Sequence, residues 1–580
     1  MVGHSELRKS RDLWLKNRSW TALAGSLVVG INSGGPPVII WSWVGVSLFS
    51  MAVAYSFAEI CSAFPVAGGQ YSWVAILAPP KYARPLSYCC GWFILIGFLS
   101  AGAGNGFVGA NFVLGMAQLA NPDFTIERWH TCLVAYLLLL LAAAVNIWGR
   151  RSLERLSQGM IIFNIVSFVM VIVIILARDH EKQSASFVFK DFQNFTGFPT
   201  AYASLLGLLQ SAFGMTGYDA TAHMTEEMRD ARNDAPKAII WAVWIGAITG
   251  FVFLVAVCFC IVDINEAASS PTGVPIFQIF YSATRSFPLA MLLCVQISII
   301  ALVSLAFLCA QSSRLTFAFA RDGGLPFSSF FSKVNHKSYV PVNAICLVVV
   351  VNMALMSIYF GSVTGFGTIL AISTEGFYLS YIMPLAVRLW GRWTGKGPEF
   401  GKGSYNLRFG MILNILGLLY LAFACITFNF PSVHPINASN MNYTCAAVGV
   451  SVLIAAVTWF TTGSKGFTGP QAGGIFQETM HGQDVLGSAD LSIHSAKVDK
   501  SPGQTSDHDD LDDEDLIYIV FYGVLDFMTA SKTSDDADLD DEDLMHIYRL
   551  VYRGVQWLDS ETSGNADLDD EDLNFYVGRD

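Results

Sequence analysis

Residues 202–224 read YASLLGLLQSAFGMTGYDATAHM, an apolar run that is long enough to cross a membrane but carries an acid. Gly214 and Gly217 lower the helix propensity of this run at the point where Asp219 and His223 appear. A carboxylate near the centre of a bilayer costs about 2.5–3.5 kcal/mol on insertion scales, so it has to face a polar cavity or a partner. The run therefore predicts a helix that is unwound at membrane depth.

The residues alone leave two interpretations of this interruption open. Unwound backbone is tolerated inside a membrane where it lines a cavity, and its free N–H and C=O groups can hold a substrate beside Asp219. The alternative is an ordinary span that ends near Gly217, with Asp219 as the N-cap of an interfacial helix.

The rest of the chain has the composition of a membrane protein. Of its 580 residues, 53% are apolar and 14% are charged, compared with about 25% charged residues in soluble domains. A helix needs about 20 apolar residues to cross a bilayer. Eleven such runs predict an all-α multi-span membrane protein; they cover residues 35–64, 86–118, 131–148, 156–177, 199–224, 237–262, 287–318, 340–360, 362–389, 408–429 and 445–462.

Lysine and arginine in the short loops indicate how the spans are oriented. One set of alternate loops carries 17 of these residues and the opposite set carries 5, and the richer set is expected in the cytoplasm. Glycosylation sequons at Asn194, Asn437 and Asn442 all fall in loops assigned to the outside. We therefore expect glycans on these asparagines, both termini in the cytoplasm, and a secretory-pathway membrane, with the plasma membrane favoured.

The segment after the interrupted span, from Glu226 to Lys237, is dense in charges of both signs. Glu226 and Glu227 are candidates for ion pairs that close the cytoplasmic side of the protein. The alternative is a solvated connector, in which these charges only face water.

Three further segments carry a family resemblance. Residues 59–73 read EICSAFPVAGGQYSW, residues 217–227 and 233–238 read GYDATAHMTEE and NDAPKA, and residues 314–326 and 341–344 read RLTFAFARDGGLP and PVNA. In this order they resemble the second span, the sixth span with its following loop, and the eighth-to-ninth loop of permeases of the amino acid–polyamine–organocation superfamily. The spacing is similar to that of the fungal branch with GABA and choline permeases, over roughly residues 19–463.

This resemblance implies an architecture and a function. It implies twelve helices in two inverted repeats of five plus two extra helices, with the first and sixth helices broken around a central site. The site residues implied by position are Gly214, Gly217, Tyr218 and Asp219, and the implied coupling or gating residues of the cytoplasmic side are Glu59, Arg321 and Asp322. The implied function is secondary active transport of amino acids or related small amines such as GABA or choline, proton-coupled and by alternating access.

The sequence shows no sign of an enzyme. No metal-ligand spacing of cysteine or histidine occurs, and no GxxxxGK[ST] motif is present that would cradle the phosphates of ATP. We therefore expect no catalytic residue, no cofactor, no metal and no nucleic-acid partner, but a small-molecule substrate, protons and membrane lipid.

Two features depart from the family pattern. Residues 1–18 are basic and polar, so the cytoplasmic half of the first helix is expected to be absent, leaving eleven spans and half of the first. A non-transporting nutrient sensor on a permease scaffold, or an inactive truncated permease, is therefore an alternative function. Glu375 lies in the tenth span where the family usually has an uncharged residue; it either couples protons or hydrogen-bonds a neighbouring helix, and we favour the second.

Residues 464–580 differ sharply from the apolar part. They carry 27 acidic and 7 basic residues, whereas residues 1–463 carry 19 acidic and 27 basic ones. The motif DLDDEDL recurs at residues 510–516, 538–544 and 567–573. This composition predicts an acidic, mostly disordered cytoplasmic tail, which serves trafficking, binds partners or has no measurable role.

Overall fold

The computed structural model describes residues 19–469, except for residues 67, 229, 271–273, 336–339, 362–363, 399, 401–404, 406, 408 and 438–439. The described part of the chain is helical and contains no β-strand. The basic N-terminus (residues 1–18) and residues 470–580, with the three acidic repeats, lie outside the described residues.

The helices have the following bounds in chain order: α2 (Ser19–Asn32), α3 (Gly35–Ala63), α4 (Gln70–Leu77), α5 (Pro80–Ala120), α6 (Arg128–Trp148), α7 (Arg150–Arg178), α8 (Ala185–Phe189), α9 (Thr200–Met215), the 3₁₀ helix η1 (Tyr218–Glu227), α10 (Ala231–Phe259), α11 (Ile264–Ala268), α12 (Pro275–Thr284), α13 (Phe287–Arg321), α14 (Ser328–Phe331), α15 (Val342–Met356), α16 (Ile358–Gly361), α17 (Gly365–Thr394), α18 (Gly410–Thr427), α19 (Thr444–Thr458), the π-helical turn η2 (Trp459–Gly463) and α20 (Ser464–Gly466).

Ten helices of the described chain are long and apolar enough to cross a membrane, which confirms the predicted all-α multi-span class. The sequence predicted eleven full spans, and the difference is the interrupted one. Its first half, α9, has 16 residues and is followed by the separate η1, so neither piece reaches the roughly 20 residues of a full span. The first span, α2, is short as well, with 14 residues.

The outer helices turn apolar side chains outward, as a lipid-facing surface requires. On α7 the exposed residues Ile162, Val166, Val169 and Val173 are spaced by three or four positions and therefore lie along one face. In contrast, α5 and α17 are the most buried of the spans. They cross closely at Gly376 and Gly97, where neither residue has a side chain. A Cβ atom on Gly376 would lie 2.7 Å from the backbone nitrogen of Gly97.

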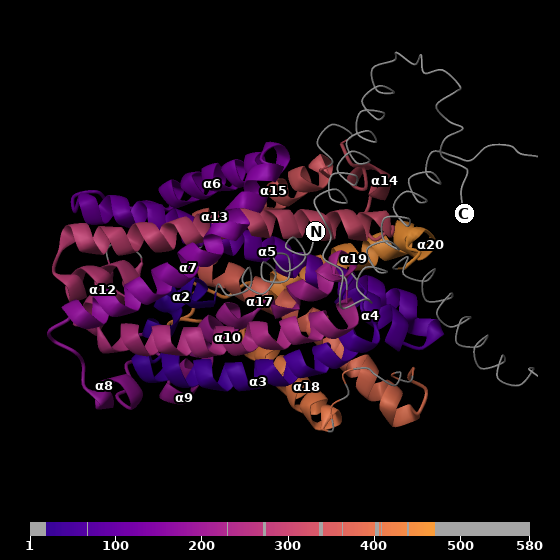
Figure 1. Ribbon diagram of the computed structural model, residues 1–580, viewed down its shortest axis with the longest axis horizontal. Coiled ribbons are helices and arrows are strands. Elements are labelled where there is room, and N and C mark those ends of the chain that lie inside the picture. Colours follow the sequence, from indigo (N-terminus) through magenta and orange to yellow (C-terminus); the bar gives the residue numbers. More distant parts are fainter. Residues whose placement is uncertain are drawn as a thin grey trace, which may run out of the picture. The chain divides into compact units, whose positions relative to one another are not determined.

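The first two spans pack against the interrupted span and the helix that follows it. α2 packs mainly on α9, and α3 mainly on α10. Figure 1 shows α10 and α3 running side by side, with α13 and α6 along the opposite side of the same unit.

Trp43 fixes the position of α3 against its neighbours. Its indole Nε1 donates a hydrogen bond of 2.9 Å to the carbonyl of Ala247 on α10. A Cβ atom on Gly250 would lie 2.2 Å from the ring, and one on Gly214 would lie 3.2 Å from it. The buried indole therefore contacts the backbone of two other helices at once.

Candidate functional site

The interrupted span breaks where its sequence predicts. α9 ends at Met215, and Gly217 then adopts a left-handed conformation with φ +84° before η1 begins at Tyr218. No other atom lies within 4 Å of a Cβ placed on Gly217, so the backbone conformation rather than space favours glycine here. Gly217 occupies the N-cap position, and the alternative prediction that Asp219 is the N-cap is wrong.

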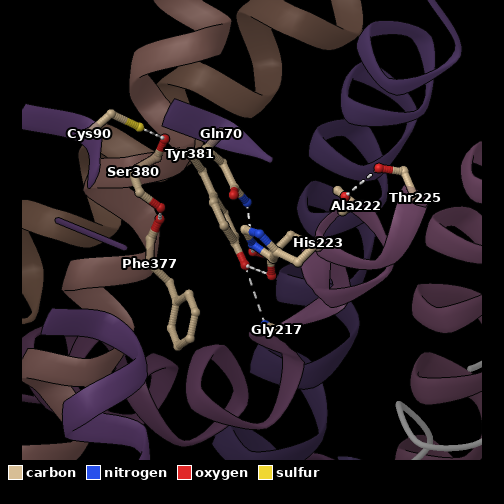
Figure 2. Close-up of polar contacts among 10 residues, drawn as sticks. Gln70, Cys90, Gly217, Ala222, His223, Thr225, Phe377, Ser380 and Tyr381 are labelled. Atoms are coloured by element: carbon tan, nitrogen blue, oxygen red, sulfur yellow. Dashed lines mark hydrogen bonds and ion pairs between the residues drawn. The ribbon is translucent and has the colours of Figure 1, made fainter. Parts of the chain in front are cut away.

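Asp219 is fully buried and accepts hydrogen bonds from three side chains. Gln70 Nε2 donates to Oδ2 over 2.6 Å and the Tyr381 hydroxyl donates to Oδ1 over 2.6 Å. The ring nitrogen Nε2 of His223 lies 3.3 Å from Oδ2. Figure 2 shows these three side chains pointing toward one another from α4, α17 and η1.

The charge of Asp219 is thus balanced mostly by neutral dipoles. Among the described residues no lysine or arginine pairs with it, and His223 is the one partner that can become positively charged. Burial of a carboxylate is costly unless hydrogen bonds or a cation replace its water. The arrangement therefore leaves Asp219 able to gain a positive group, either a proton or the cation of a ligand.

Tyr381 contacts the interrupted span at its break. Its hydroxyl oxygen accepts a 3.4 Å hydrogen bond from the Gly217 N–H while the hydroxyl proton goes to Asp219. Its ring packs edge-on against Phe57 at 5.1 Å and lies 5.3 Å from the ring of Tyr218. Phe377, one turn earlier on α17, lies 6.1 Å from it, so aromatic rings pack around the tyrosine that donates to the acid.

Two polar atoms beside Asp219 have no hydrogen-bond partner. These are the amide oxygen of Gln70 and the hydroxyl of Tyr218, both buried. Gln70 therefore offers an acceptor and Tyr218 a donor or acceptor to a ligand. Gly217 and Tyr218 lie beside Asp219 at the break, whereas Gly214 stays inside α9 and packs against Leu23 and Trp43.

Glu59 forms a second polar centre. Its fully buried carboxylate pairs with Arg388 and, over 3.3 Å, with Arg392, both on α17. Arg388 also donates to the carbonyl of Ser56 over 3.3 Å, and its guanidinium lies 4.8 Å from the centre of the Phe400 ring. We refer to Glu59, Arg388 and Arg392 as the arginine clasp, which joins α3 to α17.

The other predicted coupling and gating residues are spread over the molecule. Asp322 is buried and accepts a 2.9 Å hydrogen bond from Tyr71, while the half-exposed Arg321 lies 3.7 Å from it. Glu375 accepts hydrogen bonds of 3.1 Å to both oxygens from Asn429. Glu226 and Glu227 lie in η1, but the described part of the structure does not include their side chains.

Comparison with known sequences decides the family. A family model described as amino acid permease matches residues 18–453. The chain belongs to the amino acid permease family. Its relatives place it in the fungal branch of the amino acid–polyamine–organocation superfamily, as the motifs predicted.

Three relatives illustrate the match. A protein of Macrophomina phaseolina, provisionally named an amino acid/polyamine transporter, is 57% identical over 74% of this chain and 95% of its own length. A choline transporter of Saccharomyces cerevisiae is 33% identical over 80% of this chain and 83% of its own length. An amino-acid permease of Arabidopsis thaliana is 29% identical, over 78% and 89% respectively. The chain is therefore an integral, multi-pass transport protein and not an enzyme.

The partners of Asp219 in this permease could not be found from sequence. Gln70 lies inside the motif GGQYSW, which carried the resemblance but gave no role to that residue. His223 is a histidine deep in a span, four residues after Asp219, but the sequence places no other His or Cys near it and assigns it no role. Tyr381 lies 162 residues from Asp219 along the chain, and no pattern in the permease sequence connects them.

The three sequons of the permease differ in exposure. Asn194 and Asn437 are exposed. Asn442 is buried, and its amide nitrogen donates to the carbonyls of Phe428 at 2.8 Å and Phe430 at 3.0 Å. A glycan has to be attached to that nitrogen, so the folded structure leaves Asn442 the least accessible of the three.

Proposed function

We propose that this permease carries a small amine, either an amino acid or a related compound such as GABA or choline, across the plasma membrane by alternating access. The observation that supports this most directly is the buried carboxylate of Asp219 in the broken sixth span, held by Gln70, Tyr381 and His223. The names of the relatives, which include an amino acid/polyamine transporter and a choline transporter, favour the same class of substrate.

The chemistry around Asp219 suits a cation. A substrate ammonium would be attracted to the carboxylate, and the rings of Tyr218 and Tyr381, which lie 5.3 Å from each other, are candidates for cation–π contacts with it. A primary ammonium can also donate to the free amide oxygen of Gln70, whereas a quaternary ammonium would rely on the rings. η1 begins at Tyr218, next to Asp219, and the positive end of its helix dipole would favour a substrate carboxylate there.

In this proposal Asp219 and His223 also carry the coupling proton. Asp219 and His223 are four residues apart in η1, and the His223 ring nitrogen lies 3.3 Å from the Asp219 carboxylate. Without substrate, a proton on this pair lowers the cost of the buried carboxylate. A bound ammonium would replace that positive charge, so substrate and proton alternate at one position.

The arginine clasp lies, in this proposal, on the cytoplasmic side and holds α3 against α17 when that side is closed. Glu226, Glu227, Arg321 and Asp322 are further candidates for the same side. Residues 19–463 then form the transporter domain, while the N-terminal 18 residues and the acidic tail stay in the cytoplasm. The tail is a candidate for binding trafficking partners.

Uptake by the full chain tests the proposal. The protein is expressed in yeast cells that lack their own permeases, and uptake of labelled choline, GABA and amino acids is measured together with surface abundance. Asp219→Asn keeps the shape of the side chain and removes its charge, so substrate affinity should fall by about 1–3 kcal/mol, roughly 5- to 150-fold. Asp123→Asn, the same change at an exposed position, is the matched control.

Two results would count against this function. Unchanged uptake in Asp219→Asn, at equal surface abundance, removes Asp219 from the site. Absence of uptake for every compound, combined with ligand-induced thermal stabilisation of the purified protein by one of them, favours the sensor alternative instead.

A further inference from the structure

The chain folds back onto the membrane unit after its last helix. Phe467 is fully buried, although Gly466 and Thr468 on either side of it are exposed. Its ring lies 5.3 Å from that of Tyr88 on α5 and 6.0 Å from that of Phe319 on α13. Residues 464–469, which the sequence assigned to the acidic tail by charge, therefore pack on the membrane unit; we refer to them as the strap.

Hydrogen bonds also hold the backbone of the strap. Arg84 Nη2 donates to the carbonyl of Phe467 over 2.6 Å and to that of Ser464 over 3.2 Å. The N–H of Thr468 donates to the carbonyl of Asp322 over 3.2 Å. Gly323 adopts φ +80°, and a Cβ atom there would lie 2.2 Å from the carbonyl oxygen of Gly466, so the two backbones touch.

The point of attachment is connected to the substrate site. The carboxylate of Asp322, whose carbonyl holds the strap, accepts a 2.9 Å hydrogen bond from the Tyr71 hydroxyl. Burial, and next the nearby Asp322 carboxylate, raise the pKa of Tyr71 well above its usual range, so this hydroxyl keeps its proton and donates. Tyr71 follows Gln70 directly at the start of α4, and Gln70 donates to Asp219.

We propose that the strap is a conformational control element: when docked it holds α4 on α13 and so keeps Gln70 on Asp219, and when released it weakens that contact and alters substrate affinity. This inference rests on Asp219 being the substrate site. If the strap only anchored the end of α20, its docking would depend on Phe467 and Arg84 but would not respond to changes at Asp219. Because coupling between two sites is reciprocal, loosening Asp219 must also loosen the strap.

Limited proteolysis of the purified full chain measures docking of the strap without any ligand. Lys465 is exposed but lies in the turn of α20, so trypsin should cut after it readily only when the strap is released. We expect Tyr71→Phe and Asp219→Asn to raise the rate of this cleavage about fivefold or more. Glu375→Gln, which neutralises another buried carboxylate, is the matched control and should leave the rate unchanged.

Uptake provides the second measurement. Phe467→Ala should change the KM of the transported compound about fivefold or more at equal surface abundance. Phe460→Ala, the same change at an exposed ring seven residues earlier, should leave KM unchanged. If Phe467→Ala does not reach the cell surface, Arg84→Gln is measured in its place. This variant removes the hydrogen bonds from Arg84 to the carbonyls of Phe467 and Ser464.

The two measurements separate the possible failures. Cleavage rates equal to wild type in both Tyr71→Phe and Asp219→Asn overturn the inference and leave the strap as a static anchor. If Phe467→Ala accelerates cleavage after Lys465 but leaves KM unchanged, the strap does not control transport. If no compound is taken up at all, the proposed function fails, while the proteolysis still decides whether the strap and Asp219 are coupled.

Discussion

Replacing Glu59 with glutamine should destabilise the permease far more than a typical loss of one ion pair. The carboxylate is fully buried, and the side chain of its partner Arg388 is only 2% exposed. In Glu59→Gln the Arg388 guanidinium would stay buried without a counter-charge, and breaking a buried pair in this way costs about 3–5 kcal/mol. Arg388 keeps the Ser56 carbonyl and the Phe400 ring as partners, so we expect the lower end, about 3 kcal/mol.

The free energy of unfolding, measured by denaturant titration of the purified protein in detergent, provides the test. A matched control is the exposed pair Arg285–Glu181, with 2.5 Å between nitrogen and oxygen and side chains 58% and 60% exposed. Arg285→Gln should cost less than about 1 kcal/mol, because water screens such pairs.

A double variant examines the cause of the loss. Glu59→Gln combined with Arg388→Gln removes both buried charges, so it should be more stable than Glu59→Gln alone. If Glu59→Gln costs no more than Arg285→Gln, or if the two clasp substitutions simply add, the buried charge of Arg388 is not what the carboxylate compensates.

Three further results are expected. Asn194→Gln and Asn437→Gln should each remove a glycan seen as a mobility shift, whereas Asn442→Gln should remove none because its amide is buried; a shift only for the last variant would contradict this. Protease added to intact cells should leave residues 470–580 attached, since we place them in the cytoplasm, and loss of the tail would reverse the predicted orientation. Glu375→Gln should leave uptake and its pH dependence unchanged, because a carboxamide oxygen still accepts a hydrogen bond; a shifted pH profile would make this residue a coupling group.

Sequence was informative wherever the physics is local. Glycine beside a buried acid predicted the break at Gly217, and the length of apolar runs predicted the spans, since both depend on residues within one segment. Span ends were less well predicted. The predicted run ends at residue 389, but α17 continues to Thr394, and Arg388 within it is buried, because Glu59 on another helix compensates its charge.

Contacts between helices could not be predicted in this way. A helical period indicates which face of a span is apolar, but it does not tell which helix covers the other face. Gln70 and Tyr381 reach Asp219 from elements far apart in the chain, and Phe467 reaches α5 and α13 from beyond the last span. The strap could not be predicted from charge either. Its six residues contribute little to the charge of the long acidic segment to which they were assigned.

Trp43 limits which parts of the permease can move independently. Its ring packs against Gly214 and Gly250, and its N–H donates a hydrogen bond to the Ala247 carbonyl. The indole therefore fixes α3, α9 and α10 relative to one another. Sliding α3 by one helical turn, about 5.4 Å, would drive the indole out of the space that the glycines leave. These three helices should therefore move as one rigid body, with the backbone at Gly217 serving as the hinge beyond it. Asp219, two residues past that hinge, can then change partners without any repacking of the helices before it.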